Sequence, residues 1–322
     1  MKLASVEVRG RNILAASVSK ESLIDLTAAV EVVAPGEHFP NMLALVERGY
    51  SGLALVSRAV EAALEDVERF PRIALSDVAW HAPIRRPGKI VCLALNNSAN
   101  SDRIIQGPTH PATFVKPASA LIGHGGAIEC KSTYGRTHPE PELAVVIGKR
   151  AKNVDINAAQ QHVFGYTIHN DITSPTMRGE DTFNYRAIHP KKDAPDEIVY
   201  VDSWVSYPGR YKCADTFACM GPWLVTAEEI PDPHNLVVEC HHKGRLMTRD
   251  NTMNLFHKVP DVIAFISGYM TLEPGDVVSM GTALQKSSKG GAVQNIDLNE
   301  LGGPIAVTIE GLGTLENQVV HV

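Results

Sequence analysis

From Lys89 onward the chain consists mainly of short apolar runs separated by glycine and proline. Runs of this length between turn-forming residues are typical of β-strands. The expected strands are 89–95, 112–116, 143–147, 236–241, 276–280 and 305–310, with a hairpin turn at Lys243 and Gly244. Few segments here, chiefly 156–164 and 260–270, have the pattern of a helix. Regular alternation of strand and helix is missing, so the pattern predicts an α+β fold with a mostly β main domain.

The first 88 residues have a different pattern of apolar and polar residues. An alternating polar start predicts a strand or hairpin. Three segments are then expected to be helical: 19–33, 40–48 and 52–70. A proline-rich stretch, 82–88, has the composition of a linker. The chain is therefore expected to divide into a small, partly helical N-terminal domain, residues 1–88, and a main domain, residues 89–322.

Charge and cysteine content narrow the class of protein. The formal net charge is −6 and no run of lysine and arginine is present, so nucleic acid is not an expected partner. The five cysteines are irregularly spaced, which favours reduced thiols in a cytoplasmic protein over a disulfide framework. No apolar stretch approaches the roughly 20 residues of a membrane helix, and no signal-peptide pattern is seen, so a membrane is not an expected partner either.

Three carboxylates stand beside apolar runs of the main domain. Glu140 and Glu142 lie at the head of the run 143–147, and Asp171 ends the stretch 165–171. Side chains alternate along a strand, so Glu140 and Glu142 are expected to point the same way. Paired acids joined by a third form an oxygen-only site of the kind that Mg²⁺ or Mn²⁺ prefers. The alternative is that the three are ordinary solvated or ion-paired carboxylates.

A series of segments in residues 89–320 resembles the fumarylacetoacetate hydrolase family in order and spacing. The matching segments are FVKPASALIG (114–123), EPELAVVIGK (140–149), GYT (165–167), ND (170–171), DTF (215–217), GPW (221–223), LEPGDVV (272–278), MGT (280–282) and IEGLGTLEN (309–317). The resemblance implies a mixed β-roll or β-sandwich main domain, usually in a homodimer. It also implies one divalent cation per subunit, held by Glu140, Glu142 and Asp171, and substrate contacts from Lys212 and Thr282.

Family reactions run on β-diketo or 2-oxo acids, such as acylpyruvates and fumarylpyruvate. They include C–C bond hydrolysis, decarboxylation, isomerisation and hydration. A metal acting as a Lewis acid would stabilise an enolate of such a substrate, and the ammonium group of Lys212 would add fixed positive charge.

The chain departs from the family pattern where water is normally activated. The family's histidine and glutamate in Asn-Tyr-x-x-His-x-x-Glu are replaced by Asn100 and Arg103. Asparagine is no general base near neutral pH, so Asn100 is a candidate catalytic residue by position only. Three histidines are possible substitutes: His110, His124 and His138.

A second departure lies between Asp171 and Lys212, which are 41 residues apart, about twice the usual family separation. Pro175 stands where the family has a substrate-facing arginine. The surplus, roughly 178–207, is expected to lie near the mouth of the site or at a dimer interface. The lost positive charge could be returned by one of three residues: Arg178, Arg186 or His189.

The expected function is a divalent-metal-dependent hydrolase that cleaves a C–C bond in a β-diketo or 2-oxo acid, as in aromatic catabolism. Loss of the water-activating pair favours two alternatives. One is a decarboxylase or tautomerase of a 2-oxo diacid such as oxaloacetate. The other is a catalytically silent homodimeric binding protein.

Overall fold

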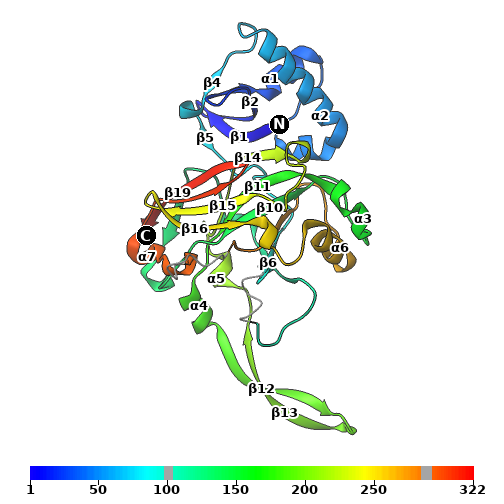
Figure 1. Ribbon diagram of the computed structural model, residues 1–322, viewed down its shortest axis with the longest axis vertical. Helices are drawn as coiled ribbons and strands as arrows, with labels where there is room; N and C mark the ends of the chain where they lie inside the picture. Colours follow the sequence, from blue (N-terminus) through cyan, green and yellow to red (C-terminus); the bar gives the residue numbers. More distant parts are fainter. Residues whose placement is uncertain (98–103, 284–291) are drawn as a thin grey trace.

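The computed structural model describes residues 1–97, 104–283 and 292–322, and the described chain is mostly strand with few helices. This confirms the α+β class. Figure 1 shows the N-terminal helices at one end of the molecule, two β-sheets in the middle, and the β12–β13 hairpin projecting from the other end. Among the described residues, no helix is long and apolar enough to cross a membrane.

The largest sheet among the described residues has twelve strands. Its strands are β1 (Lys2–Val8), β2 (Arg11–Ser17), β3 (Ser22–Asp25), β4 (Ile73–Ala74), β5 (Ala79–Trp80), β6 (Ile90–Ala94), β7 (Ala112–Lys116), β8 (Leu121–Ile122), β10 (Pro141–Ile147), β11 (Val163–Asp171), β14 (Ala218–Thr226) and β17 (Val277–Ser279). The main path runs β4-β3-β2-β1-β14-β11-β10-β17-β6-β7. Because β1 pairs with β14, the N-terminal strands extend the sheet of the main segment. The domain boundary at residue 88 stays a prediction.

A five-stranded sheet of order β16-β15-β18-β19-β9 packs on one face of the large sheet. Its strands are β9 (Ala127–Cys130), β15 (Val237–His242), β16 (Arg245–Asn251), β18 (Ile305–Ile309) and β19 (Gly313–His321). Alternation along β10 shows the two faces: Leu143 and Val145 join the core between the sheets, whereas Ala144 and Val146 join the core beneath α1 and α2. The two cores fix β10 in one register, which also fixes the direction of Glu142.

The expected strands of the main segment are confirmed, with ends shifted by at most two residues. The turn between β15 and β16 is also confirmed, and both Lys243 and Gly244 have positive φ. The helices are α1 (Leu26–Val33), α2 (Met42–Glu65), α3 (Ile156–Ala159), α4 (Pro175–Glu180), α5 (Arg210–Cys213), α6 (Val259–Tyr269) and α7 (Leu298–Leu301).

Four helix predictions need correction. The helix expected over 19–33 begins at Leu26, because Ser22–Asp25 pairs with β2 and the Asp25 side chain caps the helix. The helices expected over 40–48 and 52–70 are the two parts of α2, which is interrupted at Gly49 (φ 61°, ψ −136°) and ends at Glu65. The helix expected over 156–164 is an α-helical turn, Ile156–Ala159, followed by a 3-10 turn, Gln160–His162, and it ends there because Val163 already pairs in β11.

Candidate metal centre

The three carboxylates meet where β10 and β11 lie side by side. Glu140 directly precedes β10, Glu142 is its second residue, and Asp171 is the last residue of β11. The strands are antiparallel, with Glu142 opposite His169 and Pro141 opposite Asn170. One carboxylate oxygen from each of Glu140, Glu142 and Asp171 lies within 4.8 Å of the others. The common direction expected for Glu140 and Glu142 therefore agrees with the geometry.

Two lysines are paired with this cluster. Lys212 Nζ donates to Glu140 Oε2 at 2.7 Å and to Asp171 Oδ2 at 2.6 Å. Lys116 is fully buried at the end of β7, where Nζ forms an ion pair with Asp171 Oδ1 and donates to the backbone oxygens of Phe217 (2.6 Å) and Ile172 (3.3 Å). Both oxygens of Asp171 thus accept from an ammonium group, which fixes the carboxylate in place.

Glu142 is oriented by neutral donors. Its Oε2 accepts from Ser279 Oγ on β17 and from the Gly281 N–H at 3.2 Å, and its Oε1 accepts from Thr282 Oγ1 at 3.3 Å. His169 Nδ1 lies 2.7 Å from the same Ser279 hydroxyl and 3.8 Å from Glu142 Oε2. Thr282, expected at the substrate, is thereby placed next to the carboxylate cluster.

The titration of these groups follows from burial and crowding. Burial raises the pKa of Glu140 to about 7, an effect that Lys212 opposes and that Asp171 and Glu142 reinforce. Burial would also raise the pKa of Asp171, but the Lys116 and Lys212 ammonium groups outweigh it and hold that pKa well below its usual range. Burial would lower the pKa of Lys212, but Asp171 and the two glutamates outweigh it and raise that pKa.

The donor set fits a hard divalent cation. Three carboxylates and two ammonium groups give the cluster a net charge of −1 when all five are ionised, and every candidate ligand atom is oxygen. The structure therefore supports the three carboxylates as residues that could hold Mg²⁺ or Mn²⁺.

A cavity of about 370 Å³ lies beside the cluster, and Glu140 is the one carboxylate of the three in its lining. Its lining residues come from β6 and the chain after it, from β7, α4 and α5, and from the chain before β10, before α4 and after β17: Leu93, Ala94, Leu95, Asn96, Phe114, His138, Glu140, Thr173, Pro175, Arg178, Pro208, Tyr211, Lys212, Thr282 and Gln294. Lys212 Nζ lies 5.0 Å from the centre of the Phe114 ring, a cation–π contact on the wall. A cavity of this size suits a small organic acid. We call it the catalytic pocket below.

Of the three histidines considered as substitute bases, His138 alone lines the catalytic pocket. Its Nε2 lies 3.6 Å from Glu140 Oε1, and its buried Nδ1 has no hydrogen-bond partner among the described residues. Burial, with the charges of Lys212 and Arg136, lowers the pKa of His138 to about 4. His110 stacks on Phe265 instead. The third, His124, packs edge-on against a tryptophan on β5.

The other residues predicted for the site lie in different parts of the structure. Arg178, on α4, lines the catalytic pocket. Arg186 and His189 are on the β12–β13 hairpin, where Arg186 pairs with Asp202. Asn100 and Arg103 lie outside the described residues, so their roles stay predictions.

Sequence reasoning missed three supporting residues: Lys116, His169 and Ser279. The signal for Lys116 was a lysine at the end of an otherwise apolar strand, within a segment that matched the family.

The two-sheet fold thus carries a cluster of three carboxylates that could hold a divalent cation. The family model described as fumarylacetoacetate (FAA) hydrolase C-terminal matches residues 89–320. The chain belongs to the fumarylacetoacetate hydrolase family, whose members are hydrolases, isomerases and tautomerases.

Three similar proteins illustrate the range of the family. "Oxaloacetate tautomerase FAHD2B, mitochondrial" from Bos taurus is 31% identical over 282 residues, covering 87% of this chain and 80% of that protein. Maleylpyruvate hydrolase from Sphingobium sp. SYK-6, in complex with manganese (II) ion and pyruvate, is 28% identical with a TM-score of 0.71, covering 100% of this chain and 99% of that one. Fumarylacetoacetate hydrolase from psychrophilic Exiguobacterium antarcticum is 25% identical with a TM-score of 0.74, covering 100% of both chains. Because one relative is named as mitochondrial, the cytoplasmic location stays a prediction.

Proposed function

We propose that the protein is a divalent-metal-dependent tautomerase of a 2-oxo diacid of the oxaloacetate type, with Mg²⁺ or Mn²⁺ as cofactor. The observation that carries the proposal is that Arg178 and Lys212 both line the pocket of about 370 Å³ beside the carboxylate cluster. Two cationic side chains suit a small substrate with two carboxylates. The bovine relative, named an oxaloacetate tautomerase, supports this choice.

The chain's residues would share the work as follows. A divalent cation bound by Glu140, Glu142 and Asp171 would supply Lewis-acid stabilisation of negative charge on the 2-oxo group. Lys212 would add fixed positive charge without giving up a proton, since its pKa is raised. His138 lines the pocket, and one of its ring nitrogens would accept a proton from the substrate and return it. Because its pKa is lowered to about 4 it is a weak base, so this transfer would depend on the acidification of the substrate by the cation and by Lys212.

The test of the reaction is an enol-absorbance assay. Purified protein with Mg²⁺ or Mn²⁺ is expected to accelerate the interconversion of enol and keto oxaloacetate, and chelation by EDTA is expected to abolish the acceleration. Free metal ions act on oxaloacetate by themselves, so the same metal without protein is the required control. Absence of any acceleration above that control would contradict the proposal.

Hydrolysis of a C–C bond is the second candidate. It is supported by the similarity to maleylpyruvate hydrolase and fumarylacetoacetate hydrolase, and weakened by Asn100 and Arg103 in place of the family's water-activating pair. Metal-dependent release of pyruvate from an acylpyruvate, with no effect on oxaloacetate, would favour it. No turnover of either substrate would favour a catalytically silent binding protein.

Arg178 is expected to bind the distal carboxylate of the substrate. Because a hydrogen bond to a charged group contributes about 1.5–3 kcal/mol, Arg178→Ala should lower kcat/KM for oxaloacetate by about 10- to 100-fold. Arg186→Ala removes the same charge from the exposed hairpin, where Arg186 Nε donates to Asp202 at 3.3 Å, and should leave kinetics unchanged. Pyruvate, which lacks the second carboxylate, should inhibit wild type and Arg178→Ala equally. Equal losses of kcat/KM in Arg178→Ala and Arg186→Ala would contradict the substrate-binding role of Arg178.

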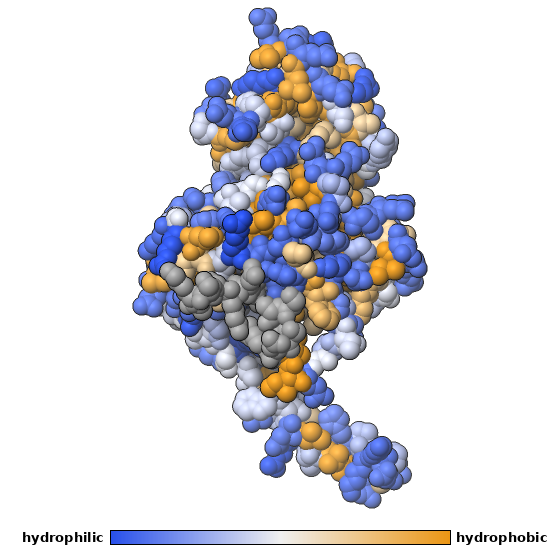
Figure 2. All heavy atoms as spheres, viewed as in Figure 1, coloured by the Kyte–Doolittle hydropathy of each residue, from blue (hydrophilic) through white to orange (hydrophobic). Residues whose placement is uncertain are grey.

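We also propose that the protein is a homodimer in which the β12–β13 hairpin contacts a second copy. The hairpin, β12 (Thr182–Lys191) and β13 (Ala194–Ser206), projects away from the body (Figure 1) and carries exposed apolar side chains, some visible in Figure 2. By the strand register, Ile188 and Trp204 lie on one of its faces and Phe183 on the other. An isolated two-stranded hairpin is marginally stable in water, and a surface so apolar marks an interaction site.

Light scattering coupled to gel filtration tests the dimer. Wild type should have twice the mass of the chain, and Ile188→Ser combined with Trp204→Ser should shift the equilibrium to monomer. Tyr50→Ser, at an exposed aromatic residue on α2, is the matched control and should stay dimeric. A wild-type monomer, or a dimer unaffected by the double substitution, would reject the proposed interface.

A further inference from the structure

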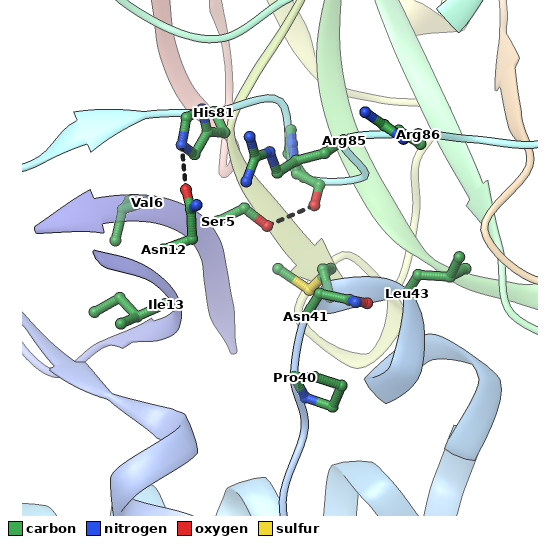
Figure 3. Close-up of a pocket in the computed structure, with 12 residues that line it drawn as sticks. Ser5, Val6, Asn12, Ile13, Pro40, Asn41, Leu43, His81, Arg85 and Arg86 are labelled. Carbon is green, nitrogen blue, oxygen red and sulfur yellow. Dashed lines mark hydrogen bonds between the residues drawn. The ribbon is translucent and has the colours of Figure 1, made fainter. Parts of the chain in front are cut away.

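A second cavity, of about 520 Å³, lies entirely within the first 88 residues and shares no lining residue with the catalytic pocket (Figure 3). It is enclosed by β1, β2, the chain before and at the start of α2, and the linker. Its lining residues are Ser5, Val6, Asn12, Ile13, Pro40, Asn41, Met42, Leu43, His81, Pro83, Arg85 and Arg86. We call it the linker cavity. Nothing in the proposed reaction uses it.

The linker cavity is positively charged. Arg85 and Arg86 are its two charged lining residues besides the titratable His81, and the lining contains no aspartate or glutamate. Neither arginine forms an ion pair or a side-chain hydrogen bond with any residue in 1–97, 104–283 or 292–322. In Figure 3 the Arg85 side chain reaches between His81 and Ser5, and Arg86 lies farther along the linker. Two uncompensated guanidinium groups beside one cavity favour an anion.

The linker is fixed where it carries these arginines. Ser5 Oγ donates to the Pro83 oxygen at 2.7 Å, and the His81 N–H donates to the Ser5 oxygen at 3.0 Å. His81 Nε2 lies 2.8 Å from Asn12 Oδ1, and Ile84 is buried. The backbone next to Arg85 is therefore held against β1 and β2, so part of the ordering cost of binding is already met in the folded protein.

His81 adds no further positive charge to the linker cavity near neutral pH. Burial lowers its pKa, and the charge of Arg85 lowers it further, while Glu7 opposes both. Glu7 Oε2 lies 4.0 Å from His81 Nε2 but is not part of the lining. The two guanidinium groups are therefore the charges that a bound anion would meet.

The remaining wall of the linker cavity is apolar. Val6, Ile13, Pro40, Met42 and Leu43 contribute it, and Val6, Ile13 and Met42 belong to the buried cores of the protein. A cavity with cationic groups at one side and an apolar wall at the other matches a small anion with an apolar body.

We propose that the linker cavity binds a small organic anion, whose carboxylate or phosphate group is held by Arg85, with Arg86 adding positive charge farther along the linker, and whose apolar body lies against Val6, Ile13 and Leu43. This site is separate from the catalytic pocket and does not depend on the proposed reaction.

Ligand-observed NMR and calorimetry with three probes test the site: benzoate, phenyl phosphate and inorganic phosphate. The Glu142→Gln protein without added metal is used to remove binding through the metal. Anion binding to Arg178 and Lys212 in the catalytic pocket is recognised because it does not depend on Arg85 or Arg86. We expect benzoate or phenyl phosphate to bind more tightly than inorganic phosphate, which lacks an apolar body. Preference between the first two identifies the anionic group as carboxylate or phosphate.

Arg85→Ala is expected to weaken binding about tenfold, since a charge-assisted hydrogen bond contributes at least that much, and Arg86→Ala, which removes a more distant charge, is expected to weaken it less. Lys152→Ala, at an exposed position outside both cavities, makes the same change in net charge and should leave binding unchanged. Failure of all three probes to bind at about 10 mM, or equal binding by the Arg85, Arg86 and Lys152 variants, would overturn the proposal.

Discussion

Glu142→Gln is expected to abolish metal-dependent turnover and to weaken metal binding by at least about 100-fold. Glu142 is buried, and its two oxygens are already oriented by Ser279, the Gly281 N–H and Thr282. An amide at this position keeps the size of the side chain but removes a negative charge and one oxygen donor. Changes to residues that merely orient a ligand cost about 10- to 100-fold, so loss of a ligand charge should cost more.

Thermal denaturation with and without Mn²⁺ measures the effect independently of activity. A metal present at about 100 times its Kd stabilises the native protein by about 2.7 kcal/mol, and this gain should vanish in Glu142→Gln. Glu239→Gln is the matched control, because Glu239 pairs with His241 and Arg249 on the other sheet. If Glu142→Gln kept the wild-type response to Mn²⁺, Glu142 would not be a ligand.

The carboxylate cluster was accessible from the sequence because it depends on short-range geometry. Alternation along one strand placed Glu140 and Glu142 on one face, and the structure agrees. Asp171 needed one further step, the pairing of β11 with β10, which no local pattern determines. The family resemblance supplied that step by matching ordered segments rather than by physical reasoning.

Other features depended on contacts between distant parts of the chain. The sequence of Ser22–Asp25 is compatible with a helix. The segment is a strand because it pairs with β2. The buried strand β14 was not expected, because Gly221 and Pro222 interrupt its apolar run. The 178–207 segment was recognised as an insertion, but its extended hairpin form was not.

The choice between Arg178, Arg186 and His189 also required the structure. All three were equivalent as positive charges in one polar insertion. Because α4 packs beside the cluster, Arg178 lines the catalytic pocket, whereas the chain leaves the body before it reaches Arg186. Position in the fold, rather than residue type, therefore selects the substrate-binding candidate.

Lys116→Met is expected to lower the free energy of unfolding by about 3–5 kcal/mol. Lys116 is fully buried, and its ammonium group contacts Asp171 and the backbone oxygens of Ile172 and Phe217. Methionine fits the same space but leaves one oxygen of the buried Asp171 and the Ile172 carbonyl without this donor, while the Phe217 carbonyl keeps only the Ile172 N–H at 3.0 Å. Removing one partner of a buried ion pair costs this much because the remaining charge stays buried.

Urea denaturation of the metal-free protein measures the loss, with Lys191→Met as the control. Lys191 pairs with Glu197 on the exposed hairpin, where an ion pair contributes at most about 1 kcal/mol. Each substitution removes one ammonium group that is paired with one carboxylate. The difference between their losses in free energy of unfolding therefore measures the effect of burial rather than of charge. If Lys116→Met cost no more than Lys191→Met, Lys212 alone would suffice to compensate Asp171, and the inferred structural role of Lys116 would be wrong.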